Sequence, residues 1–139
     1  MDVVVKMKFI IDYDSLLNQR IDEVFVGAPS NIVTKIFGVP DMPIYKINKK
    51  SKIFSHVYGN LNILSENGKI IAILIDFHTG STNVIELDKS INAGFEHWLS
   101  FAKKNGYDVE KNDDMVKILG TGIAICLSCN GVVTMISFH

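Results

Sequence analysis

The chain has 139 residues, of which 47% are hydrophobic, and its 14 basic and 15 acidic residues give a net charge of −1. This length suits one domain over residues 1–139, and the near-zero charge argues against a dedicated nucleic-acid surface. The longest apolar run, Ile70 to Ile75, is far below the roughly 20 residues of a membrane-spanning helix. We expect neither a nucleic-acid nor a membrane partner.

The N-terminal segment predicts a strand. Apolar and more polar positions alternate from Val3 to Ile11, with a period near two. Lys6 and Lys8 interrupt the apolar stretch, and no cleavage site of small residues follows it, so it does not resemble a signal peptide. We therefore expect a cytoplasmic protein.

Two short helices are predicted next. The first follows an N-cap at Asp14 or Ser15 and continues to Phe25, and the second spans about 30–38 and ends at a glycine. The second helix carries a single basic residue, whereas a recognition helix needs several polar and basic side chains. We interpret the pair as packing elements and not as a DNA-binding motif.

From Ile44 to Tyr58 the pattern is that of two strands joined by a basic turn. The turn region holds the only local cluster of one charge sign, which consists of Lys46, Lys49, Lys50 and Lys52. Such a cluster is usually a solvated loop tip, and the alternative is a contact with phosphate or with an acidic partner.

One β-hairpin pattern occurs twice, as GNLNILSENGKIIAI from Gly59 and as GIAICLSCNGVVTMI from Gly122. Asn-Gly between alternating apolar runs is typical of a hairpin with a type I′ turn. Between the copies, the sequence predicts a helix ending near Asn105, with Trp98 in the core, and a strand over 115–119. The fold class is therefore predicted as α+β, an antiparallel sheet built from two similar helix-plus-hairpin halves (about 14–78 and 88–139), with the helices packed on one face.

A two-residue turn at Asn67-Gly68 assigns the hairpin residues to two faces. The expected core face carries Leu64, Ile71, Ile73 and Ile75 in the first copy and Ile123, Ile125, Leu127, Thr134, Ile136 and Phe138 in the second. The opposite face is also largely apolar, with Leu61, Ile63, Ile70, Ala72, Leu74, Ala124, Cys126, Val133, Met135 and Ser137. Either the N-terminal helix covers this second face, or a partner does.

Motifs for chemistry are sparse. Cys126 and Cys129 have the spacing of half a zinc site, but no second pair exists. The four histidines His56, His78, His97 and His139 are scattered, and the sequence contains no GxSxG, P-loop or GxGxxG pattern. We expect no catalytic residues, no metal and no cofactor.

The order of the structural motifs resembles that of small bacterial immunity proteins encoded beside secreted toxins. The matching segments are Ile32-Val33 through Phe37-Gly38-Val39-Pro40-Asp41, then Tyr58-Gly59-Asn60-Leu61, and the hairpin end Ile73-Leu74-Ile75-Asp76. The resemblance covers most of the chain beyond Asp14. A more distant similarity is to the helix–helix–sheet repeat of β-lactamase inhibitor proteins and outer-membrane assembly lipoproteins, from which this chain differs by lacking paired disulfides and a lipobox cysteine.

The resemblance implies a non-enzymatic cytoplasmic protein that neutralises a cognate protein toxin by occlusion. The predicted partner-binding residues are Tyr45, Phe54, His56, Tyr58, Leu61, Leu74 and Met135. One alternative is a small-ligand-binding or enzymatic domain with a pocket between helix and sheet near His56, Tyr58 and Trp98. Another is a homodimer that buries the second sheet face against itself.

Overall fold

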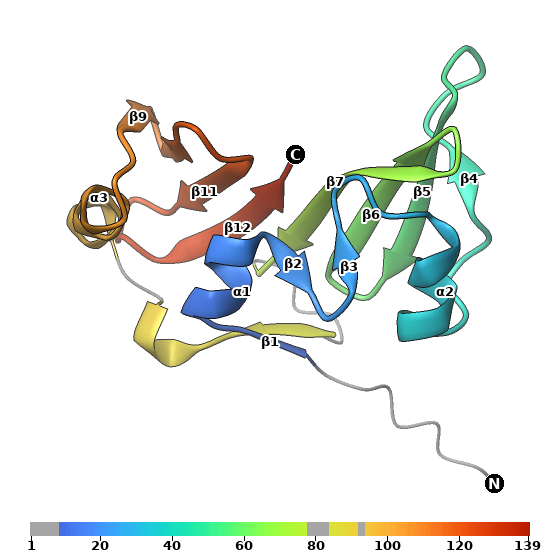
Figure 1. Cartoon of the computed structure of the whole chain (residues 1–139), viewed down its shortest axis with the longest axis horizontal. Helices are drawn as coiled ribbons and strands as arrows, with labels where there is room; N and C mark the ends of the chain where they lie inside the picture. The colour runs from blue at the N-terminus through green and yellow to red at the C-terminus, as the bar shows by residue number, and fades with distance from the viewer. Residues whose placement is uncertain (1–8, 78–83, 92–93) are drawn as a thin grey trace, which may run out of the picture.

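A computed structural model describes residues 9–77, 84–91 and 94–139 of the chain (Figure 1). Its helices are α1 (Tyr13–Asn18), α2 (Asn31–Phe37) and α3 (Phe95–Lys104), with a short 3-10 helix η1 at Lys89–Ile91. Its strands are β1 (Phe9–Ile11), β2 (Arg20–Ile21), β3 (Val24–Phe25), β4 (Tyr45–Lys46), β5 (Ile53–Tyr58), β6 (Leu61–Glu66), β7 (Lys69–Asp76), β8 (Ile85–Leu87), β9 (Val109–Asn112), β10 (Met115–Ile118), β11 (Ile123–Leu127) and β12 (Val133–Phe138). The predicted N-terminal strand over residues 3–8 lies outside the described residues, and its end is β1.

The main sheet has eight strands in the order β4-β5-β6-β7-β12-β11-β10-β9, and every neighbouring pair is antiparallel. It consists of two four-stranded meanders that meet where β7 pairs with β12. Two small sheets accompany it, a parallel pair β1–β8 and an antiparallel pair β2–β3. The fold is mixed α+β and dominated by the sheet.

The first predicted helix is too long. α1 begins after Asp12, whose side chain accepts a hydrogen bond from the backbone N–H of Ser15, and it ends before Gln19, which has a left-handed φ of 52°. The prediction of helix to Phe25 is wrong because Ile21 and Val24 face each other across the β2–β3 hairpin. Ile21 and Val24 are three positions apart, and this spacing fits a cross-strand pair in a tight hairpin as well as it fits one turn of a helix.

The other predicted helices are confirmed. α2 lies within the expected span and ends at Gly38, which has a φ of 81°. α3 ends before Asn105, and its Trp98 is fully buried. None of the described helices is both long enough and apolar enough to cross a membrane.

The two central hairpins have different turns. Asn67 and Gly68 have φ values of 53° and 76°, as a type I′ turn between β6 and β7 requires. In the second hairpin only Gly131 of the Asn-Gly pair has a positive φ, and the loop that connects β11 to β12 covers residues 128–132. The type I′ turn predicted for the second copy is therefore wrong.

A β-bulge in the first hairpin shifts its pairing by one residue. Leu64 pairs with Ala72 instead of the predicted Ile71, so Ile71 is the extra residue on β7. The shift turns Leu64 away from the core and Leu61 toward it, which corrects the predicted faces of β6. Thr134 is likewise an extra residue on β12 in the second hairpin. Ile70 and Val133, which precede the two bulged residues, were predicted on the second face but are buried in the core, whereas the predicted faces of β11 are confirmed.

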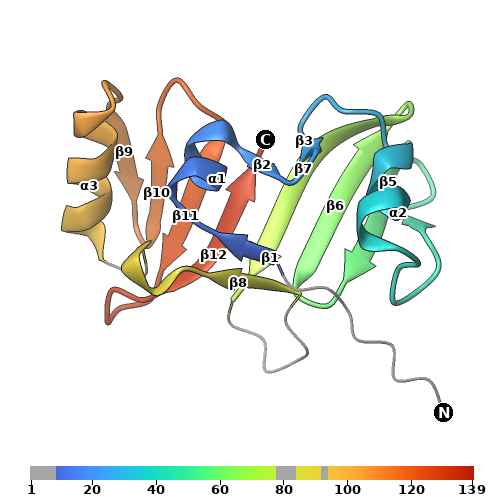
Figure 2. The same cartoon turned by 60° about the horizontal axis from the view of Figure 1, so that its bottom comes forward.

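The core lies between one face of the large sheet and the helices. The buried side chains of the three helices belong to the same apolar cluster as the inward residues of the sheet, and they are Leu16, Val33, Trp98 and Ala102. Figure 2 shows α1, α2 and the small strands β1 and β8 in front of that single face, with α3 beside the edge strand β9. The alternative in which the N-terminal helix covers the second face is therefore wrong.

Candidate partner-binding face and a pocket between two helices

The second face of the large sheet is called the open face below. Strand register places on it Tyr45, Ser55, Val57, Asn62, Leu64, Ala72, Leu74, Asp76, Met115, Lys117, Ala124, Cys126, Met135 and Ser137. No helix or strand of the described ranges lies over it (Figures 1 and 2). An apolar sheet face without a covering layer is typical of an interaction surface.

The centre of the open face is apolar and only partly shielded. Leu64, Leu74 and Met135 keep part of their surface accessible. The Ser55 hydroxyl, beside them, donates a 2.6 Å hydrogen bond to Asn62 Oδ1, so these polar groups are paired within the face. A partner that docks here gains apolar contact without having to satisfy those two groups.

The predicted partner-binding residues fall into two groups. Leu74, Met135 and Tyr45 lie on the open face, and Phe54 is exposed on the other face near the sheet edge. The remaining three, His56, Tyr58 and Leu61, are at most 6% exposed and belong to the buried face, so a partner at the folded surface cannot touch them. These three residues lie on the core side because the bulge at Ile71 turns Leu61 and Ile63 of β6 inward, and Tyr58 and His56 pair with these two residues.

His56 is buried, and its hydrogen-bond partner among the described residues is an uncharged one. Its Nε2 lies 2.8 Å from Ser65 Oγ, in hydrogen-bond contact, while Nδ1 has no partner among the described residues. Burial lowers the pKa of the imidazole below its usual 6.5. The side chain therefore behaves as a neutral core histidine.

The motif residues that carry the family resemblance meet in space. The Tyr58 hydroxyl donates a 2.8 Å hydrogen bond to the carbonyl of Gly38, and the Gly59 amide donates one of 2.6 Å to Asp41 Oδ2. Burial, followed by the charge of Asp41, raises the pKa of Tyr58. The motif thus fastens the end of α2 to the turn after β5, which is a structural role.

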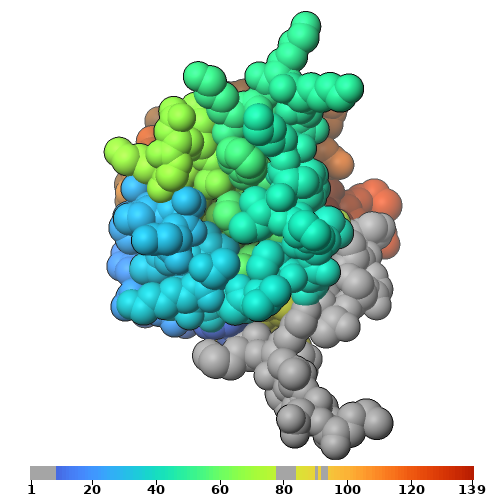
Figure 3. Space-filling model, turned by 90° about the vertical axis from the view of Figure 1, so that its right-hand side faces the viewer, coloured from blue at the N-terminus to red at the C-terminus, as the bar shows by residue number. Residues whose placement is uncertain are grey.

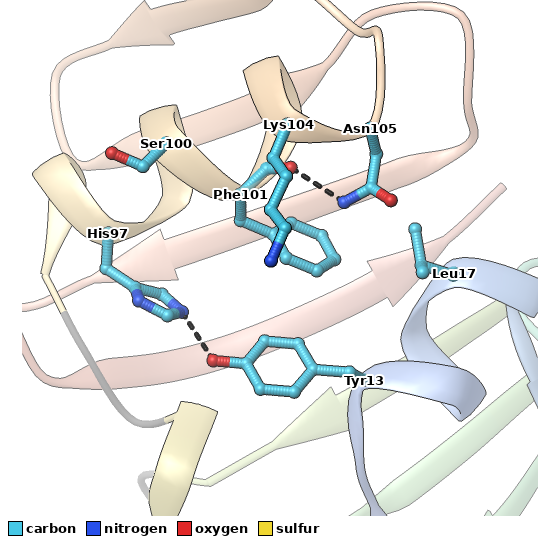
Figure 4. Close-up of a pocket in the computed structure, with 7 residues that line it drawn as sticks. All are labelled: Tyr13, Leu17, His97, Ser100, Phe101, Lys104 and Asn105. Carbon is cyan, nitrogen blue, oxygen red and sulfur yellow. Dashed lines mark hydrogen bonds between the residues drawn. The ribbon is translucent and has the colours of Figure 1, made fainter.

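A solvent-open pocket of about 480 Å³ lies between α1 and α3. Its lining is Tyr13, Leu17, His97, Ser100, Phe101, Lys104 and Asn105, drawn in Figure 4. The rings of Tyr13 and Phe101 stack with centroids 5.3 Å apart, and Tyr13 Oη lies 2.9 Å from His97 Nε2. Burial, with a smaller effect of Asp88, raises the pKa of Tyr13, so its phenol stays protonated at neutral pH.

This pocket is not where the sequence placed it. The expected residues His56, Tyr58 and Trp98 fill the core instead of lining a cavity. Tyr13 and His97 are 84 positions apart in the sequence, and only the packing of α1 beside α3 brings them together. No motif in the sequence signals the pair.

The cysteines form no joint site. Cys126 and Cys129 are free thiols, and burial together with Asp114 raises the pKa of Cys126, which disfavours the reactive thiolate. No group of three or more His, Cys, Asp or Glu side chains in the described ranges could hold a metal ion.

Comparisons of the chain with known proteins identify no relative. No protein-family model, curated protein or solved structure matches the chain. The open face and the pocket between α1 and α3 are therefore the features from which a function can be argued.

Proposed function

We propose that the protein is a non-enzymatic binding protein of the cytoplasm, and that it neutralises a cognate protein toxin by occluding it with the open face. The observation that carries the proposal is the asymmetry of the large sheet. One face packs against all three helices, while the other presents Leu64, Leu74 and Met135 with no described element over them.

The order of motifs supports the choice of a toxin as the partner. The segments over residues 38–41 and 58–61 resemble the pattern of immunity proteins, and their hydrogen bonds tie the helix to the sheet. A rigid sheet face suits occlusion, because little conformational entropy is lost when it binds.

The test uses the product of the neighbouring gene. We expect the two proteins to co-purify, and co-expression to restore growth that the toxin alone arrests. Leu74→Glu places a charge in the centre of the open face and should abolish both effects. Leu99→Glu makes the same change at a 37% exposed position of α3 and should leave both intact.

Thermal unfolding of both variants separates a lost interface from a lost fold. If Leu74→Glu still binds and protects as the wild type does, the open face is not the interface. Failure of the wild-type protein to bind or neutralise any neighbouring gene product would contradict the toxin function itself.

The internal repeat is part of the same proposal. We infer that the two meanders descend from duplicated hairpins, β6–β7 and β11–β12, which now adjoin through β7 and β12. In support, the bulged residues Ile71 and Thr134 occupy matching positions of the two sequence copies.

A second candidate function is small-ligand binding between α1 and α3. The hydrogen-bonded Tyr13–His97 pair beside the Phe101 ring favours it, because such pockets combine apolar walls with few polar groups. Ligand-observed NMR with a library of small aromatic acids tests it. Ser100→Trp, which fills the pocket, should abolish every specific signal, and signals that persist would place the binding elsewhere.

A further inference from the structure

Residues 44–54 form a projection that we call the basic arm. It comprises β4, the connecting turn and the first residues of β5, and Figure 3 shows it extending from the top of the molecule. The turn is ordered by its own hydrogen bonds, since the Ile47 amide donates to the Ile53 carbonyl and the Lys50 amide to Asn48 Oδ1. The arm therefore has a defined backbone conformation that presents its side chains in fixed positions.

The charge of the basic arm is of one sign. It holds four lysines, Lys46, Lys49, Lys50 and Lys52, and no acidic residue, although the whole chain has a net charge of −1. None of these ammonium groups has an ion-pair partner among the described residues, and Lys46 instead lies over the Phe54 ring at 6.0 Å. Four unneutralised charges attract an acidic surface.

The arm and the segment leading into it also gather exposed apolar side chains. All residues from 41 to 50 are exposed. Of the thirteen large hydrophobic residues exposed in the described ranges, six lie between positions 39 and 54, namely Val39, Met42, Ile44, Tyr45, Ile47 and Phe54. Exposed aromatic and aliphatic groups beside charges are typical of a protein-binding surface.

The arm is continuous with the open face. Tyr45 pairs with Ser55, which places the tyrosine ring on the open face at the outer strand. A partner that covers Leu64 and Leu74 therefore also meets Tyr45 at the base of the arm.

We propose that the basic arm recognises a protein partner through an acidic patch that borders an apolar one. This inference rests on the proposed binding function and adds the chemistry of the partner. Electrostatic attraction to the arm would steer the encounter, and apolar contact with Tyr45 and Ile47 would hold the complex.

The arrangement of the arm favours a protein over a membrane or a nucleic acid. The tip is Asn48-Lys49-Lys50-Ser51, so insertion into a bilayer would bury two charges before any apolar group. The arm contains no arginine, the side chain best suited to bidentate phosphate recognition.

The experiment titrates the isotope-labelled full chain with a short peptide in which glutamate alternates with leucine or phenylalanine. We expect NMR shift changes confined to residues 39–54 and neighbouring residues of the open face, with an affinity that falls as salt is raised. Lys49→Glu/Lys50→Glu should weaken binding about tenfold. Lys35→Glu/Lys103→Glu changes the net charge equally at exposed sites outside the arm and should leave the affinity unchanged.

Parallel titrations use vesicles of phosphatidylcholine with phosphatidylglycerol and a short DNA duplex. Tighter arm-dependent binding of either than of the peptide would overturn the inference, as would peptide binding that the arm variant does not change. If Leu74→Glu abolishes toxin binding while the arm variant binds normally, the acidic partner is refuted and the proposed function stands. The reverse result is also informative. If the peptide binds the wild type and the control variant but not the arm variant, and no neighbouring gene product binds the wild type, the toxin function is refuted and the binding role of the arm is supported.

Discussion

The side-chain amide of Asn60 exchanges two hydrogen bonds with the backbone of Ile85. Its Nδ2 donates to the Ile85 carbonyl at 2.8 Å, and the Ile85 amide donates to Oδ1 at 3.0 Å. The Val84 amide also donates to Oδ1, at 2.9 Å. A single buried side chain in the turn between β5 and β6 thus anchors β8, and with it the small parallel sheet, to the large one.

Asn60→Ala should destabilise the fold by about 2 to 3 kcal/mol, because it leaves two buried amides and one carbonyl without their partner. Urea unfolding measures the loss. Asn112→Ala removes the same side chain at an exposed position of β9, and we expect it to stay within about 0.5 kcal/mol of the wild type. Equal losses in the two variants would contradict the anchoring role of Asn60.

Gly122 lies where no side chain fits. A Cβ there would collide with the backbone carbonyl of His139 and approach Gln19 Oε1 to 2.9 Å, and that same oxygen accepts a hydrogen bond from the Gly122 amide. Gly122→Ala should therefore cost about 1 to 3 kcal/mol as the chain shifts to relieve the overlap. The melting temperature reports the change.

Gly94 supplies the control for this substitution. A Cβ at Gly94 would make only ordinary contacts, the nearest at 3.7 Å, so Gly94→Ala should cost a few tenths of a kcal/mol through loss of a favourable N-cap. If Gly122→Ala lowers the stability less than Gly94→Ala does, the backbone near His139 can move to accommodate a Cβ, which would contradict the predicted overlap.

Local patterns predicted much of this molecule. The first Asn-Gly turn, α2 and the burial of Trp98 depend on residues close in sequence, and each was correct. Pairing across long separations could not be predicted. The β1–β8 sheet pairs segments that are far apart in the sequence, and Asn60 anchors β8 from another distant turn. The single bulged residue Ile71 was enough to invert the face of β6.

The candidate site was predicted in part for the same reason. Leu74 and Met135 were placed correctly on the second face because β7 and β12 keep the expected alternation beyond their bulged residues. His56 and Tyr58 were misplaced because they pair with Ile63 and Leu61 of β6, the strand whose face the bulge reverses.

His56 should make the protein less stable in mild acid. Its pKa in the folded state lies below the usual 6.5 of the unfolded chain, so the unfolded state binds the proton more readily as the pH falls through that value. The free energy of unfolding is therefore highest above this pH and declines until the pH passes the folded-state pKa. Within the described ranges, the ring's hydrogen-bond contact is with the Ser65 hydroxyl, and desolvation is the cause of the lowered pKa.

Chemical denaturation across this pH range, compared with His56→Gln, isolates the effect. The glutamine amide keeps a donor for Ser65 but does not titrate, so the variant should show a flatter dependence on pH. Parallel curves for the two proteins would contradict the assignment.

Asp41→Ala should lower stability by about 1 kcal/mol, since the Gly59 amide loses its acceptor at a site exposed to water. Asp41→Asn keeps an oxygen acceptor and should recover most of the loss. Thermal unfolding distinguishes the two, and equal destabilisation would mean that the charge of Asp41, and not its hydrogen bond, matters.

The pairing of β7 with β12 also bears on how fast the chain folds. Every other neighbouring pair of the large sheet joins strands that are consecutive in the sequence, whereas this pair brings Ile73 against Phe138. Bringing these distant segments together lowers the conformational entropy of the chain before the contacts that stabilise the pair have formed. We expect each meander to form early and their union to limit the folding rate, which would leave the edges of β7 and β12 briefly open to pairing with another copy of the chain.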